Sequence, residues 1–485
     1  MTETTNDRVD SMQVAEQSQH GASRRHLLLL GAVLLLALAL RLAWIAYAHP
    51  NPNDGRFDDT LFYDHAAQAL AAGKGYPGFF DAQTAGWPPG YPLLLAGIYK
   101  VVGHDFLAPR LLNVFAGVAT CLLVYLLGAR VFDRRTGLVG AFLLAVFPSH
   151  VYRTTLLMTE VLTAAAVVLL ALLLLRWVMK EGGPSRLQAV ALGVLFGAFA
   201  LTRGEALAFV PVALIVWKLA VPSWRRFAGG AALMLSAMVL AVAPWTIRNA
   251  ITMDAFIPVA SGLGHTFLAG HQDDPYDPYS VFPEAKITVQ YSYLPYPERE
   301  MKVEREALRQ GLDFAKSHPG YEVQLVFEKA FNMYKSDDDA LPWIGGGWID
   351  ASKAPWLQGS WVRSLDAVGT PVVTIPAAAE HNWKHLANGY YFAVLLLAAT
   401  GVFAWFSLRD RRKVLLVLLV GAWTLLHLAF MPGSRYHAPL LPLFALWAAA
   451  GVVLLWDRLV SLFGRSRERS RPTEADSPLS PSGAA

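Results

Sequence analysis

The stretch LLLLGAVLLLALALRLAWIAYA at residues 27–48 decides the class of fold. An apolar run of this length matches the roughly 20 residues that an α-helix needs to cross a lipid bilayer. Eight residues after it, the sequence RFDDTLFYDH at 56–65 brings three aspartates together. A membrane-spanning helix followed at once by an acidic cluster indicates polar chemistry at a membrane surface.

The first apolar run permits other interpretations. Ser23-Arg24-Arg25 resembles a twin-arginine signal, and Ala46-Tyr47-Ala48 resembles a cleavage site. The run is longer than the apolar part of a signal peptide, however, and further apolar runs follow it. We therefore expect an uncleaved first helix.

Composition extends the membrane assignment to the whole chain. Of 485 residues, 54% are hydrophobic and 16% are charged, whereas a soluble protein carries about a quarter charged residues. The arginines stand beside apolar runs and not along one polar face, so nucleic acid is not an expected partner. Cys121 is the single cysteine, which excludes a disulfide or a cysteine-based metal site within one chain.

The sequence predicts an all-α integral membrane protein with about ten transmembrane helices. The expected spans are 27–48, 109–129, 136–150, 159–178, 187–201, 206–221, 227–246, 389–408, 414–431 and 437–456. Lys and Arg concentrate at alternate connections, which by the positive-inside rule places both chain ends in the cytoplasm. The short pair 187–201 and 206–221 could instead form a hairpin that crosses only part of the membrane.

These spans divide the chain into modules. We expect disordered cytoplasmic tails at 1–22 and 465–485, an N-terminal membrane module at 27–248 and C-terminal membrane helices at 389–456. Residues 249–388 are too long for a simple connection and should form a small extracytoplasmic α-rich domain. Within that domain, residues 297–317 have helical spacing that His318-Pro319 ends.

The first outer loop, residues 49–108, carries the acidic cluster. Two of its segments, DHAAQALAAGKGY (64–76) and GWPPGYPLLLAGIYKVVG (86–103), predict helices that lie along the membrane surface. Asp58 and Asp59 could then simply be solvated or cap a helix that begins at Thr60. Alternatively, they face the headgroup of an amphiphile and take part in chemistry.

An ordered set of short motifs favours the second possibility. They comprise Asp59, Tyr63, Ala67, Leu70, Gly73 and Gly75, then PPGYPLLLAG (88–97), Arg110, Asn113, MTE (158–160), PWTIRN (244–249), HPGY (318–321) and RYHAPLLP (435–442). Over residues 27–456 the chain resembles the GT-C glycosyltransferases, in the bacterial branch near protein O-mannosyltransferases and aminoarabinose transferases. The resemblance implies a GT-C helical bundle with its active site on the extracytoplasmic face of the cell inner membrane.

The same resemblance implies roles for the acidic residues. Asp59 matches the catalytic carboxylate, which would accept the proton of an acceptor hydroxyl as it attacks the anomeric carbon. Asp58 is the alternative base, and Asp64 could orient the acceptor or the base.

The implied donor is a sugar on a polyprenyl phosphate, whose departing phosphate needs cations at the membrane surface. Candidates for phosphate or substrate binding are Arg248, Arg203, Arg435, Lys329, Tyr63 and Glu160. Each arginine could instead only extend to lipid headgroups. Glu160 could likewise only stabilise a helix N-terminus.

No cofactor is predicted, although His265 and His271 stand near carboxylates and a divalent metal is conceivable. The acidic run 337–339 is expected to be a solvated turn.

The implied function is inverting transfer of a single sugar from a polyprenyl-phosphate donor to an extracytoplasmic glycan, lipid or protein. A glycan polymerase or ligase that uses a diphosphate-linked oligosaccharide is the alternative. A transporter is a further one, but it should show internal repeats, and the sequence shows none.

Overall fold

The computed structural model describes residues 3–48, 59–78, 82–273, 284–345, 377–431 and 433–469. Within these ranges the regular structure is helical, and one isolated bridge, between Pro77 and Gln83, is the only extended pairing. The prediction of an all-α fold is therefore confirmed.

Six helical segments of the described residues are long and apolar enough to cross a membrane, as expected for a multi-pass protein. They are α1 (Glu3–Tyr47, apolar from Arg24), α4 (Leu107–Val131), α7 (Glu160–Leu173) with the π-turn η2 (Leu174–Val178), α10 (Trp224–Met253), α17 (Ala377–Trp405), and the 3-10 turn η6 (Ser434–Leu440) with α19 (Leu441–Arg469). The expected number of ten spans is not confirmed.

Shorter helices occupy the other predicted spans. They are α5 (Arg134–Ala145) with α6 (Pro148–Tyr152), α8 (Arg186–Thr202), α9 (Phe209–Ala220) and α18 (Arg411–Leu428). The 3-10 turns η1 (Arg153–Thr155) and η3 (Gly204–Ala208) follow α6 and α8.

The predicted span 136–150 is interrupted because Phe147 precedes Pro148 and adopts an extended backbone. A proline disfavours helical geometry at the residue before it. The buried Arg41 of α1 compensates for this interruption, since its Nη1 donates to the carbonyl of Ala145 at 3.2 Å and its Nη2 lies 2.8 Å from Nδ1 of His150.

The first helix begins earlier than expected, because α1 continues back to Glu3 through the segment predicted to be a disordered tail. Once the apolar span has formed a helix, each added residue gains a hydrogen bond without a new nucleation step. At the other end, α19 extends to Arg469, and residues 470–485 of the predicted C-terminal tail lie outside the described residues.

Close helix pairs in the bundle meet at glycines. In α17 and α19, a Cβ added at Gly401 would lie 2.1 Å from the carbonyl oxygen of Trp447, and one at Gly451 would lie 2.3 Å from that of Leu397. Only residues without a Cβ allow backbones to approach this closely in a membrane, where small residues are the usual contact.

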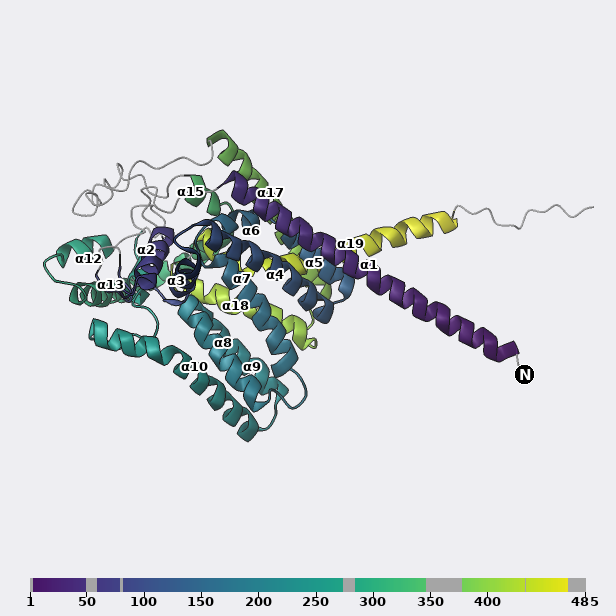
Figure 1. The fold of residues 1–485 in the computed structure, drawn as a ribbon, viewed down its shortest axis with the longest axis horizontal. Helices are drawn as coiled ribbons and strands as arrows, with labels where there is room; N and C mark the ends of the chain where they lie inside the picture. The colour runs from purple at the N-terminus through teal and green to yellow at the C-terminus, as the bar shows by residue number, and fades with distance from the viewer. Residues whose placement is uncertain are drawn as a thin grey trace, which may run out of the picture.

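Helices outside the bundle gather at one of its ends (Figure 1). They are α2 (Asp59–Ala71) and α3 (Gly90–Val102) from the first outer loop, then α11 (Leu263–Gly270), α12 (Glu284–Gln290), α13 (Glu298–Ser317), α14 (Pro319–Tyr334) and α15 (Ala340–Gly345). The two loop helices and the helix predicted at 297–317 are thus confirmed as helices.

Glu300 of α13 connects the two outer segments. Its carboxylate accepts hydrogen bonds from Thr84 Oγ1 at 2.7 Å, from the Ala85 N–H at 3.1 Å and from Ser261 Oγ at 2.7 Å. Burial raises the pKa of Glu300 above its usual value, and these hydrogen bonds oppose that shift. The first outer loop is therefore held against α13 by one half-buried side chain.

The described terminal parts of α1 and α19 lie on the side opposite these outer helices. Figure 1 shows the N-terminal part of α1 and the C-terminal part of α19 projecting from the same end of the bundle, away from α12 and α13. That both chain ends lie in the cytoplasm stays a prediction.

Thiol labelling tests which side that is. In a Cys121→Ser background, we expect Ser292→Cys to react with an impermeant reagent in intact cells, because exposed Ser292 follows α12 at the outer end. Ser461→Cys, exposed near the end of α19, should react only after the membrane is permeabilised. The reverse pattern would invert the predicted orientation.

Candidate active site

Asp59 is the first residue of α2, where its carboxylate faces the positive end of the helix dipole. Trp87 donates its indole N–H to Oδ1 at 3.2 Å, and Arg435 donates Nη1 to Oδ2 at 2.8 Å. The Asp59 and Arg435 side chains are each 23% exposed. The carboxylate is thus oriented by two partners and remains accessible to a substrate.

Tyr63 lies one turn further along α2 and is buried. Burial raises the pKa of its hydroxyl well above the usual value, the charges of Asp59 and Glu160 raise it further, and Arg203 and Arg435 oppose them. Arg435 pairs with Asp59, and its Cζ lies 5.2 Å from the centroid of the Tyr436 ring, while Cζ of Arg203 lies 5.8 Å from the same centroid. We call Asp59, Tyr63, Glu160, Arg203 and Arg435 the Asp59 group.

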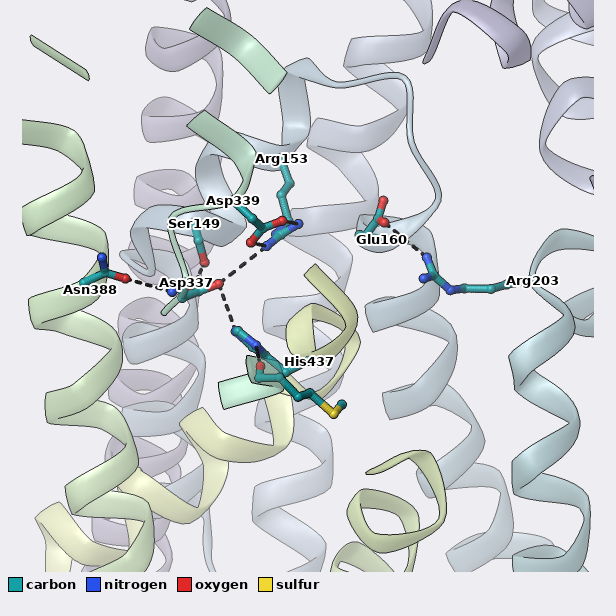
Figure 2. A network of polar contacts seen from close by, with 9 residues as sticks. Ser149, Arg153, Glu160, Arg203, Asp337, Asp339, Asn388 and His437 are labelled. Carbon is teal, nitrogen blue, oxygen red and sulfur yellow. Dashed lines mark hydrogen bonds and ion pairs between the residues drawn. The ribbon is translucent and has the colours of Figure 1, made fainter. Parts of the chain in front are cut away.

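Glu160 begins α7, and Arg203 follows α8. Arg203 Nη1 donates to Oε1 of Glu160 at 3.2 Å, an ion pair visible in Figure 2, and to Oγ1 of Thr159 at 2.8 Å. Its Nε lies 3.4 Å from Oε1 of Glu205. Both members of the Glu160–Arg203 pair are buried, so the pair forms a fixed wall beside the more accessible Asp59.

The Asp59 group has the chemical components of a transfer reaction. Asp59 can accept a proton, and the guanidiniums of Arg203 and Arg435 can stabilise negative charge on a phosphate. The apolar surroundings strengthen such interactions, because little water competes for the charged groups. The sequence predicted these residues as candidate site residues, and the fold places them together.

Asp64 lies apart from this group. It is fully buried, and its carboxylate accepts hydrogen bonds from Tyr99 OH at 2.6 Å and Gln68 Nε2 at 2.8 Å, with His104 Nε2 at 3.0 Å. These contacts join α2 to α3 and to the turn after it. Asp64 is therefore placed to support the loop and not to orient an acceptor.

Arg248 is also used to hold the loop. Its guanidinium donates to the carbonyls of Thr84 at 2.6 Å and Tyr76 at 3.3 Å, and to Oε1 of Gln83 at 2.8 Å. It also lies over the Trp245 ring, with Cζ 4.8 Å from the centroid. These contacts occupy the guanidinium that was expected to receive a phosphate.

Lys329 lies apart from both the Asp59 group and the contacts that hold the first outer loop. It is buried in α14, with Nζ 3.3 Å from Nε2 of His271, whose Nδ1 lies 2.8 Å from the Glu322 carboxylate. His265 pairs instead with Glu304 of α13, at 2.7 Å. Among the residues that the structure describes, no three His, Cys, Asp or Glu side chains form a metal-binding group.

Asp58, the alternative base, lies outside the described residues.

The expectation of a solvated turn at 337–339 is wrong. Asp337 is fully buried, and its carboxylate contacts Ser149 Oγ, Arg153 Nη2 at 3.5 Å and His437 Nε2 at 3.1 Å (Figure 2). Asp339 forms a second ion pair with Arg153, at 2.5 Å. The Arg153 guanidinium compensates the buried carboxylate of Asp337, and Ser149 and His437 are its other partners, which is the condition for burying charge.

Sequence reasoning overlooked both Trp87 and this buried network. The run of three aspartates was visible, but its partners at 149, 153 and 437 come from two other parts of the chain. The pattern Arg435-Tyr436-His437 could have indicated these contacts, since two polar residues flank an aromatic one in a turn. In η6, Arg435 reaches Asp59 and His437 reaches Asp337.

Lys329 gives a pH-dependent test of its structural role. Burial lowers its pKa from 10.5 to about 8, so between these values the unfolded chain binds more protons there than the folded protein. Stability must therefore rise with pH across that window. We expect the melting temperature of the wild type to rise relative to Lys329→Met between about pH 8 and pH 10.

The same pair of proteins should show no relative change between about pH 6 and pH 7, where Lys329 is protonated in both states. Parallel melting curves across the whole range would contradict the buried placement of the ammonium group.

Part of the chain is similar to a known family. Residues 87–247 match the family model described as dolichyl-phosphate-mannose-protein mannosyltransferase. A Pyrococcus horikoshii protein, dolichyl-phosphooligosaccharide-protein glycotransferase 1, is 32% identical over 152 residues, which are 29% of this chain and 16% of the relative.

Solved structures share the fold over more of the chain. The Archaeoglobus fulgidus oligosaccharyltransferase AglB, solved with an inhibitory peptide and a dolichol-phosphate, matches with a TM-score of 0.51 and 16% identity. The match covers 94% of this chain and 52% of AglB, so the chain spans about half the length of that relative. ArnT from Cupriavidus metallidurans, bound to undecaprenyl phosphate, matches with a TM-score of 0.41 and 15% identity, over 87% of this chain and 77% of ArnT.

The matched family segment contains Trp87, Glu160 and Arg203 of the candidate site, and the helical bundle that surrounds it is shared with AglB. The chain thus has the GT-C fold, and its residues 87–247 are similar to the dolichyl-phosphate-mannose-protein mannosyltransferase family.

Proposed function

We propose that this protein is a membrane glycosyltransferase that moves a single sugar from a polyprenyl-phosphate-linked donor to an extracytoplasmic acceptor. The observation that carries the proposal is the Asp59 group, in which one accessible carboxylate lies beside two guanidiniums at the outer end of a membrane bundle. Its location in the cell inner membrane, with the active site outside, belongs to the same proposal.

Asp59 is the general base in this mechanism. A sugar or protein hydroxyl is a weak nucleophile, and a positioned carboxylate that accepts its proton accelerates attack by about 10² to 10⁴-fold. The acceptor oxygen forms a bond to the anomeric carbon while the bond from that carbon to the phosphate oxygen breaks. Because attack and departure occur on opposite faces, the configuration at that carbon is inverted.

Arg435 and Arg203 receive the departing phosphate. A guanidinium has five N–H donors in a rigid plane, so Arg435 can keep its bond to Asp59 and still offer donors to a phosphate oxygen. Arg203 is held in place by Glu160 and by the rings of Trp423 and Tyr436, each 5.8 Å from its Cζ. This fixed cation would stabilise the charge that develops on the leaving group.

The comparisons support a lipid-linked donor. The matched family is named for mannose carried on dolichyl phosphate, and the AglB structure contains a dolichol-phosphate. An outer-face site also has no access to cytoplasmic nucleotide sugars. The donor would therefore arrive as a lipid already moved across the membrane, with its phosphate at the surface and its chain along the bundle.

A second function remains in view because the matched Pyrococcus protein is named for a phosphooligosaccharide donor and AglB is an oligosaccharyltransferase. Such an enzyme would transfer a preassembled oligosaccharide. The mass added to the acceptor separates the two: one sugar supports the proposed transfer, whereas several sugars added in one step support the alternative, and release of a lipid diphosphate would also support an oligosaccharide donor.

Asp59→Asn should reduce the transfer rate by at least about 10²-fold, because an amide cannot accept the proton at neutral pH. The matched control is Asp64→Asn on the same helix. There an amide group would replace one carboxylate oxygen and face a donor, Tyr99 OH or Gln68 Nε2, so we expect a lower melting temperature and a smaller loss of rate per folded molecule.

Asp58→Asn should cost less than Asp59→Asn. The opposite order would move the base by one residue, and full activity of both single variants and of the double variant would exclude a general base at this cluster.

The donor is tested with purified protein, a polyprenyl-phosphate sugar and an acceptor. Polyprenyl monophosphate should appear in step with glycosylated acceptor, and nucleotide sugars should not substitute. Arg435→Ala should lower the rate by about 10² to 10³-fold, as expected for losing one preorganised donor to the leaving group. Arg248→Ala should instead mainly lower the melting temperature, since it holds the first outer loop.

Efficient transfer from a nucleotide sugar would overturn the donor assignment. If Arg435→Ala and Arg248→Ala lost the same rate at equal stability, membership of the Asp59 group would not identify the arginine that binds the phosphate.

A further inference from the structure

An arginine-rich cavity lies at the end of the bundle opposite the Asp59 group. Its volume is about 720 Å³, and its lining comes from the ends of α4 and α7 and from the connection between α17 and α18. The lining residues are Arg130, Leu175, Arg176, Met179, Ser407, Arg409, Asp410, Arg411 and Arg412. We call it the basic cavity.

Two helices extend from this cavity to the candidate active site. Glu160 begins α7 and Arg176 lies in the π-turn at its far end, so the two are separated by roughly 24 Å of helical rise. Similarly, α18 begins at Arg411 beside the cavity and carries Trp423, near its other end, against Arg203. The basic cavity is therefore distinct from the proposed catalytic site.

The charges in the cavity are unbalanced. Five arginines line it, and Asp410 is the single acidic residue in the lining. The Asp410 carboxylate is already engaged by Arg412 Nε at 3.1 Å and by Lys413 Nζ at 3.3 Å. The cavity consequently keeps a strong net positive charge that Asp410 does not neutralise.

Some of these arginines build the wall, and others remain available. Arg412 Nη1 donates to the carbonyl of Arg130 at 3.0 Å, and Arg411 Nη1 donates to that of Leu219 at 3.2 Å. Among the described residues, no side-chain hydrogen bond or ion pair holds the exposed guanidiniums of Arg176 and Arg409. These two groups can turn toward a ligand without breaking an existing contact.

The local backbone adds to this arrangement. Arg176 lies within the π-turn η2, and single π-turns inside α-helices often occur at binding sites. The turn also brings Leu175 to the same cavity, where Met179 adds a second apolar wall. A ligand that suits this lining carries negative charge at one end and apolar material beside it.

We propose that the basic cavity binds a phosphate group, supplied by the headgroup of an anionic membrane lipid or by a free phosphate compound. Guanidiniums pair with phosphate through two parallel N–H donors, which a lone carboxylate in the lining does not prevent. Basic cavities between membrane helices on the cytoplasmic side are suited to anionic lipid headgroups. This binding lies beyond the proposed transfer reaction and does not depend on it.

The test uses the purified full-length chain in neutral detergent. Binding is measured with short-chain phosphatidylglycerol, with inorganic pyrophosphate, and with short-chain diacylglycerol as the phosphate-free control. The cavity variant is Arg176→Gln with Arg409→Gln. The matched control is Arg225→Gln with Arg226→Gln, which removes two exposed arginines at the same end of the bundle but outside the cavity.

We expect saturable binding of phosphatidylglycerol by the wild type and the control variant, and a Kd at least about tenfold higher for the cavity variant. Binding of the lipid alone identifies a lipid headgroup as the source, and equal binding of pyrophosphate shows that a free phosphate compound suffices. Both results support phosphate recognition. Since no described residue pairs with the guanidinium of Arg176 or Arg409, unliganded melting temperatures should match.

Three results would overturn the proposal. They are equal weakening in the cavity and control variants, binding of diacylglycerol as tight as that of phosphatidylglycerol, and absence of saturable binding by the wild type. The first would show that the arginines contribute only general surface charge.

Discussion

The ion pair between Asp59 and Arg435 is the contact on which the candidate site depends. It joins the first outer loop to the turn before the last helix, across 376 positions of sequence, with a 2.8 Å separation between Nη1 and Oδ2. At a partly exposed position, such a pair contributes little to stability by itself. Its significance is geometric, because it sets the accessible carboxylate beside the cation that would face a donor phosphate.

The turn η6 can hold this pair because it is itself held by buried contacts. Trp423 donates its indole N–H to the carbonyl of Tyr436 at 2.6 Å, and His437 contacts the Met333 carbonyl at 2.6 Å and Asp337 at 3.1 Å. A buried polar network restricts a backbone strongly, since moving any member leaves a charged group without a partner. Arg435 therefore projects from a rigid base toward Asp59.

The two ends of the bundle carry two charged regions, the Asp59 group and the basic cavity, which differ in how their charges are arranged. At the outer end, carboxylates and guanidiniums alternate and pair, which leaves Asp59 oriented and only partly neutralised. At the other end, five arginines share a cavity with one carboxylate. The first arrangement suits acid–base chemistry with charge that moves, whereas the second suits retention of an anion. Helices α7 and α18 extend between the two, so a single scaffold positions both.

Sequence alone determined the membrane class, the helices of the first outer loop, the helix at 297–317 and the candidate residues Asp59, Tyr63, Glu160, Arg203 and Arg435. These follow from local properties: apolar length, helical spacing, a proline after a helix, and motifs in a characteristic order. Only the tertiary structure decided which candidates lie together. Arg248, Lys329 and Asp64 have similar polar chemistry, but their donors and acceptors are occupied elsewhere. Asp337 is buried because Arg153 and His437 reach its carboxylate. The physical reason is that the role of a charged side chain depends on its partners and its access to solvent, and these are set by segments hundreds of residues away.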